Sequence, residues 1–136
     1  MNLHRTIMIA VLSMAAALSG CRTLPAEIRI DMMPATVTLE AGQAVRLPDG
    51  ARLRYLRLVH DSRCPVDVQC IHAGDAEIEL RHRPATGAVR TLRLGTADSP
   101  LRSAPTTATF DDWKLRLDRL DRRQPPRATL TLSRRD

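Results

Sequence analysis

Apolar residues recur at every second position in short runs from Ile28 to the end of the chain. This alternation gives an extended segment one apolar and one polar face, which is typical of antiparallel strands. Gly and Pro residues separate the runs at spacings of roughly ten residues, as in all-β domains. The pattern predicts an all-β fold, either an antiparallel β-sandwich or a partly open barrel, with about seven short strands.

The first half of this region contains two successive turn signals and a candidate central strand. The turns are predicted at Ala41-Gly42 and at Pro48-Asp49-Gly50, each as the turn of a hairpin. The run Leu53 to Val59 alternates at first and then changes face at Tyr55-Leu56. A change of face predicts a bulge or a strand buried on both sides, so we expect this run to lie centrally.

Four further strands are predicted in the second half. The segment 76–81 places its even-numbered residues inside and Glu77 and Glu79 on the solvent side. Pro84 to Gly87 then turns the chain into a strand carrying Val89, Leu92 and Leu94, which completes a third hairpin. The segment 113–120 also alternates, although its apolar residues fit one face of a helix too. The neighbouring strands favour the strand interpretation, and a last strand is expected at 128–132.

The N-terminus has a different pattern. His4 and Arg5 precede Ile7 to Leu18, which are twelve residues without a charge. Twelve helical residues span about 18 Å, whereas the hydrocarbon layer of a bilayer is about 30 Å thick. The segment therefore predicts an N-terminal signal helix that is cleaved during export, not a membrane span.

The segment Leu18-Ser19-Gly20-Cys21 resembles the lipobox of bacterial lipoproteins. The resemblance implies cleavage after Gly20 and attachment of acyl chains such as palmitate to Cys21, and two or more chains anchor a protein stably to a membrane. The alternative is an ordinary secretory signal. Either way the predicted organisation is a signal peptide at 1–20, the lipidated cysteine with a tether at 21–27, and a single β-domain at 28–136.

The expected location is the cell envelope. The residue directly after Cys21 is Arg22, whereas an aspartate at that position would resemble an inner-membrane retention signal. In a Gram-negative cell, the lipid-anchored chain is therefore expected on the periplasmic face of the outer membrane.

The formal net charge is +6, from 21 Lys and Arg against 15 Asp and Glu, and Lys114 is the single lysine. Arginine suits phosphate and carboxylate, so anionic lipid headgroups or envelope polymers are candidate neighbours. The ordinary interpretation is a set of solvated strand faces, because the arginines alternate with carboxylates and apolar residues. These arginines are Arg46, Arg54, Arg57, Arg81, Arg90, Arg93 and Arg116. No run resembles a nucleic-acid footprint, and aromatic residues for base stacking are scarce.

With Cys21 acylated, Cys64 and Cys70 are the two remaining thiols in an oxidising compartment, which predicts a disulfide between them. The alternative is a periplasmic metal site built from His60, Cys64, Cys70 and His72, since zinc and copper accept such ligands. The spacing lacks the usual pair of cysteines two residues apart, and exported thiols oxidise. His82 is interpreted as a surface residue.

The segment from Asp61 to Gly74 resembles one found in small bacterial exported proteins and lipoproteins, in which Asp-Ser-Arg-Cys-Pro precedes a second Cys and an aromatic-Ala-Gly sequence. His72 stands where the resemblance leads us to expect Trp. The resemblance carries no established activity with it.

No catalytic set is evident. Asp61, Ser62, His60 and His72 could supply an acid, a nucleophile and a base, but neighbouring Ser and His side chains on an extended chain point apart. Glu77 and Glu79 could form a paired-carboxylate site, but alternation explains them as the wet side of a strand. We therefore expect no enzymatic activity and no cofactor. The predicted function is a membrane-anchored binding or structural module whose stapled loop, from Cys64 to Cys70, meets an envelope protein, or whose arginines meet an anionic envelope polymer.

Overall fold

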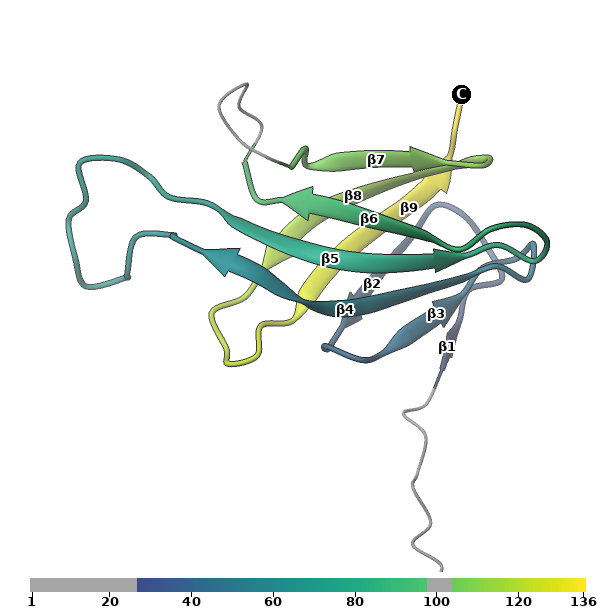
Figure 1. The fold of residues 1–136 in the computed structure, drawn as a ribbon, viewed down its shortest axis with the longest axis horizontal. Helices are drawn as coiled ribbons and strands as arrows, with labels where there is room; N and C mark the ends of the chain where they lie inside the picture. The colour runs from purple at the N-terminus through teal and green to yellow at the C-terminus, as the bar shows by residue number, and fades with distance from the viewer. Residues whose placement is uncertain (1–26, 98–103) are drawn as a thin grey trace, which may run out of the picture.

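The computed structural model describes residues 27–97 and 104–136, which form two facing sheets without a helix (Figure 1). One sheet has the strand order β1-β3-β4-β5-β6, and the other has the order β2-β9-β8-β7. The strands are β1 (Ile28–Arg29), β2 (Ala35–Leu39), β3 (Ala44–Arg46), β4 (Arg52–Asp61), β5 (Ala76–Arg83), β6 (Arg90–Gly95), β7 (Thr107–Phe110), β8 (Trp113–Leu120) and β9 (Ala128–Arg134). The all-β prediction is confirmed in its sandwich form, because the sheets do not close into a barrel.

Strand β4 is the middle strand of the five-stranded sheet, as the sequence predicted. Its pairing with β5 shifts register between Tyr55 and Arg57 and again between Leu58 and His60. The first shift lies where the apolar pattern changes face, so the predicted bulge is confirmed.

Two of the three predicted hairpins are present. The turn at Pro48-Asp49-Gly50 joins β3 to β4, and the turn at Pro84 to Gly87 joins β5 to β6, each pair being antiparallel. The hairpin predicted at Ala41-Gly42 is wrong, because β2 pairs with β9 in the other sheet while β3 pairs with β4. The chain changes sheets at this turn, where Gly42 has a φ of 90° that glycine adopts without a Cβ penalty.

The segment 113–120 is a strand, β8, and not a helix. Trp113, Leu115 and Leu117 face the core, and a register shift between Leu117 and Arg119 turns Leu120 inward as well. This bulge explains why the same residues fit a helix face. Strand β7, which is rich in threonine and has one large apolar residue, was not predicted.

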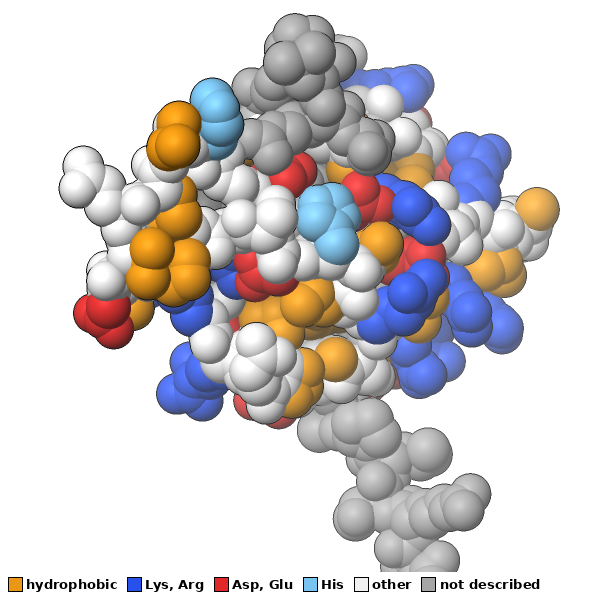
Figure 2. All heavy atoms as spheres, turned by 60° about the vertical axis from the view of Figure 1, so that its left-hand side comes forward, with side chains coloured by type: hydrophobic (Ala, Val, Ile, Leu, Met, Phe, Trp, Pro, Cys, Tyr) orange, Lys and Arg blue, Asp and Glu red, His pale blue; other side chains and the backbone are white. Residues whose placement is uncertain are grey.

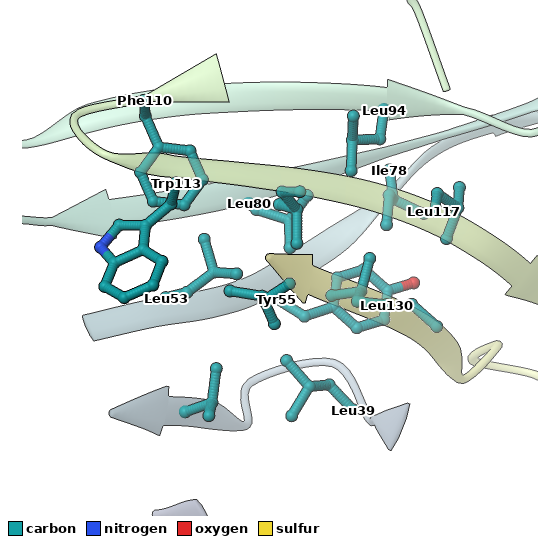
Figure 3. Close-up of a cluster of buried hydrophobic side chains, with 14 of the residues drawn as sticks. Leu39, Leu53, Tyr55, Ile78, Leu80, Leu94, Phe110, Trp113, Leu117 and Leu130 are labelled. Atoms are coloured by element: carbon teal, nitrogen blue, oxygen red, sulfur yellow. The ribbon is translucent and has the colours of Figure 1, made fainter. Parts of the chain in front are cut away.

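The core lies between the sheets and contains the inward-facing residues of both (Figure 3). Its fully buried large side chains include Leu53, Leu80, Leu94, Trp113 and Leu130. Every described strand and every described core residue lies between residues 28 and 134. A chain that begins at Arg22 therefore retains the whole described fold.

His82 is not a surface residue as expected: its exposed fraction is 0%. It continues the inward alternation of β5, and its ring centroid lies 4.3 Å from that of Phe110 on β7. Burial lowers the pKa of His82, because a charged ring is poorly solvated there. The outward face of the same strand also differs from expectation, since Glu77 is buried beside Arg93.

Candidate functional site: the stapled loop between β4 and β5

The loop from Ser62 to Asp75, from here on called the stapled loop, extends beyond the end of the five-stranded sheet, to the left in Figure 1. It connects the two longest strands of that sheet, β4 and β5, and it contains both cysteines of the predicted disulfide. A long loop held on a rigid sheet is a common position for binding residues.

Cys64 and Cys70 form the predicted disulfide, with an S–S distance of 2.14 Å and a Cα–Cα distance of 5.9 Å. The bond closes a short loop, for which chain entropy gives a stabilisation of roughly 2 kcal/mol. The disulfide restricts the segment between the cysteines to few conformations in the folded state.

Arg63 fixes the base of the loop to the other sheet. Its Nε and Nη2 donate to the two carboxylate oxygens of Asp61 at 2.8 and 2.5 Å. Its Nη1 donates to the backbone oxygen of Leu120 at 2.6 Å, and Nη2 also donates to that of Asp121 at 3.0 Å. The hydrogen bond from Arg63 lowers the pKa of Asp61. The planar guanidinium thus joins the end of β4 to the turn after β8.

The two sides of the loop meet closely at Ser62 and Gly74. The backbone N–H of Ser62 donates to the backbone oxygen of Asp75 at 2.7 Å, and the Asp75 N–H donates to the Ser62 hydroxyl at 3.2 Å. A Cβ atom on Gly74 would lie 1.6 Å from the backbone oxygen of Ser62. Only glycine fits this approach, which gives a physical reason for the Ala-Gly end of the segment singled out in the sequence.

The tip of the loop exposes three large apolar side chains. Val66 is 78% exposed, Val68 is 56% exposed and Ile71 is 95% exposed. Figure 2 shows apolar side chains standing out on this end of the molecule, with a histidine beside one of them. Single exposed apolar residues are ordinary, whereas three on one braced loop make this tip the candidate interaction surface of the described residues. The sequence carried this signal in Val66 and Val68 between the cysteines and in Ile71 directly after Cys70.

The structure does not bring His60, Cys64, Cys70 and His72 together as a metal site. The two sulfurs are bonded to each other, and His60 Nε2 lies 3.4 Å from Asp75 Oδ1. His72 is exposed on the loop. Within residues 27–97 and 104–136, no group of three or more His, Cys, Asp or Glu side chains has the arrangement of a metal site.

The carboxylates of Glu77 and Glu79 form ion pairs with arginines. Arg93 Nη1 donates to Glu77 Oε1 at 3.0 Å, and Arg57 Nη2 donates to Glu79 Oε2 at 3.2 Å. The expectation that both residues form the wet side of β5 is wrong for Glu77, which is 2% exposed. It is buried because it lies opposite His60 on β4 and Gly95 on β6 while Arg93 pairs with its carboxylate.

The structure does not describe Cys21 or the segment before it, so the predicted signal peptide and lipidation site lie outside the described residues. Among the residues described, there is no helix with the length and hydropathy that crossing a bilayer requires. No family model, curated protein or solved structure matches the chain. Its function must therefore be inferred from its own residues and their geometry.

Proposed function

We propose that this chain is an envelope lipoprotein, anchored through Cys21, whose β-domain is a non-enzymatic binding module. The stapled loop contacts a second envelope protein through Val66, Val68 and Ile71. The observation that carries the proposal is the exposure of these three side chains on a loop fixed by a disulfide and by Arg63. The signal-like N-terminus and the lipobox resemblance support the anchor.

A braced apolar loop suits protein binding for two reasons. The disulfide and the Arg63 contacts already restrict the loop, so binding loses little additional conformational entropy. Burying exposed apolar side chains against a partner also removes their surface from water, which favours binding. Asp67 is the single charged residue from Cys64 to Ala73, so the expected partner surface is an apolar pocket with a polar rim.

Site-specific cross-linking tests the loop contact. A photo-reactive residue would replace Ile71 in the full chain, expressed with its own N-terminus, and a matched chain would carry it at Val89. Val89 is also an exposed apolar residue, 46% exposed, but it lies in the β5–β6 turn. We expect one discrete protein adduct from position 71, its loss when Val68→Ser is added, and no such adduct from position 89.

Two outcomes contradict this assignment. Equal protein adducts from positions 71 and 89 would indicate contacts without specificity. Adducts from position 71 with lipid alone would show that the apolar tip inserts into the membrane and does not bind a protein.

The anchor is tested separately by metabolic labelling. Cells that express the full chain are supplied with radiolabelled palmitate, and we expect label in the wild-type protein and none in Cys21→Ser. A Cys64→Ser/Cys70→Ser variant is the control, because it removes the other two thiols and should keep the label. Absence of label in the wild-type protein would contradict the lipid anchor. It would not affect the loop contact, which the cross-linking experiment tests.

A further inference from the structure

Four arginines face one another on the outer side of the five-stranded sheet, at the end where β4 begins and β5 ends. Arg52 is directly opposite Arg83 in the β4–β5 register, and Arg54 is directly opposite Arg81. Side chains directly opposite in an antiparallel pair are neighbours, and like charges in these positions destabilise the sheet. The sequence distributes arginines along each strand, and the pairing register brings these four together.

The positive charge of this cluster is mostly uncompensated. Arg52 is paired with Glu27, which also lies 3.3 Å from Arg46. The guanidinium groups of Arg54, Arg81 and Arg83 make no hydrogen bond or ion pair with any residue in 27–97 or 104–136. Farther along the same face, Arg57 and Arg93 are neutralised, because each pairs with a carboxylate of β5.

The four side chains surround a shallow depression with a volume of about 190 Å³. Its remaining lining residue is Ala44, which is opposite Arg54 on β3 and has too small a side chain to fill the space. Guanidinium groups present planar pairs of N–H donors that match the oxygens of a phosphate group. The depression thus has the size, charge and donor set of an oxyanion site.

We propose that Arg52, Arg54, Arg81 and Arg83 bind the phosphate groups of anionic lipid headgroups and so orient the domain on the membrane to which it is anchored. The lipid assignment rests on the proposed anchor. Glu27, whose carboxylate contacts Arg52, is six residues after Cys21. Six residues span at most about 20 Å, so a lipid on Cys21 places the cluster within that distance of the headgroups.

Vesicle binding by the unanchored domain tests the site. The chain from Arg22 to Asp136, exported without the lipid, would be sedimented with vesicles of phosphatidylcholine alone or mixed with phosphatidylglycerol. We expect binding to the anionic vesicles, weakening as salt rises, and no binding to the neutral ones. Since this chain carries no acyl group, the result does not depend on the lipidation of Cys21.

Two charge-matched variants separate a site from general electrostatic attraction. Arg54→Gln/Arg81→Gln removes one facing pair, and Arg119→Gln/Arg122→Gln removes two arginines from β8 and the turn after it, on the other sheet. We expect the first variant to bind anionic vesicles about 30-fold more weakly and the second to change binding by no more than about threefold. Equal losses in both variants would overturn the proposal.

Thermal unfolding shows whether Arg54→Gln/Arg81→Gln still folds. Unfolding in the presence of inorganic phosphate shows whether the site binds phosphate without a lipid. Removing a like-charged pair should leave the midpoint unchanged or raise it. Inorganic phosphate should raise the midpoint of the wild type more than that of Arg54→Gln/Arg81→Gln. A response to phosphate without any binding to anionic vesicles would overturn the lipid assignment, and equal responses of both proteins to phosphate would overturn the site itself.

Discussion

Two polar side chains in the core, Tyr55 and His82, are buried without a hydrogen bond from any described residue to their side-chain polar atoms. A buried polar atom without a partner loses its hydration and gains nothing in return. His82 Nε2 does lie 3.5 Å from Asp111 Oδ2, which is an ion-pair distance only when the ring is protonated. Both residues therefore predict measurable effects on stability.

Tyr55→Phe should keep or increase the free energy of unfolding, by up to about 1 kcal/mol, because it removes an unpaired hydroxyl from the core. Burial raises the pKa of Tyr55 to about 12. Tyr55 is the one tyrosine of the chain, so ultraviolet absorbance reports its ionisation directly. Urea unfolding followed by Trp113 fluorescence measures the stability.

The control for this substitution is Leu53→Ala, which leaves a cavity in the same strand and should cost about 2–5 kcal/mol. A loss of more than about 1 kcal/mol in Tyr55→Phe would show that the hydroxyl makes a stabilising hydrogen bond.

His82 predicts a stability that depends on pH. Burial lowers the pKa of the folded ring below the unfolded value of 6.5. Below pH 6.5 the unfolded chain therefore binds more protons than the folded one, and the free energy of unfolding falls as pH falls through this window. Above that pH the contribution is fully present. His82→Leu should have a flatter profile in urea unfolding between neutral and mildly acidic pH.

His72→Gln is the matched control, because it removes an exposed histidine of the loop. It should keep the wild-type profile. If His82→Leu lost stability with falling pH as steeply as the wild type, another group would be responsible.

At the scale of elements, the loop between β4 and β5 is stabilised by contacts that leave its tip free. The disulfide closes the loop near its tip, and Ser62 and Gly74 meet at its base. Arg63 connects this base to the other sheet. The contacts that form the base therefore do not involve the three exposed apolar side chains, which remain available for a partner.

Arg63→Met should lower the free energy of unfolding by about 2–3 kcal/mol. The Arg63 side chain is 12% exposed, and its loss leaves the Asp61 carboxylate and two backbone oxygens without their donor. Urea unfolding and proteolysis of the loop measure the effect.

Arg123→Met is the control. Arg123 lies in the turn after β8, which Arg63 contacts, but the Arg123 side chain is 65% exposed. Its effect should stay within about 0.5 kcal/mol. Similar losses in the two variants would mean that the Arg63 hydrogen bonds add no more than a surface ion pair.

At the scale of the whole molecule, the two proposed surfaces lie toward opposite ends of the five-stranded sheet (Figure 1). Strand β4 begins at the arginine cluster and ends at the stapled loop, and its ten residues span roughly 30 Å. A domain held to the membrane at its arginine end would present the loop away from the bilayer. This arrangement is consistent with a protein partner for the apolar tip.

The sequence by itself determined most of the strands, although not β7, since period-two alternation is a property of each segment alone. It predicted the central position of β4 and the bulge near Tyr55 from the residue pattern, and the disulfide from the two cysteines and the expected oxidising compartment. The same alternation extended by one step would have placed His82 inside, beyond Leu80.

Only the tertiary structure decided which segments pair, because pairing joins residues far apart in the chain. It assigned β2 to the sheet of β9, so the turn at Ala41-Gly42 is not a hairpin. It buried Glu77 between neighbouring strands and set Arg52 and Arg54 opposite Arg83 and Arg81. Alternation specifies which face a side chain occupies, whereas the register of two strands specifies its neighbours, and binding surfaces depend on the neighbours.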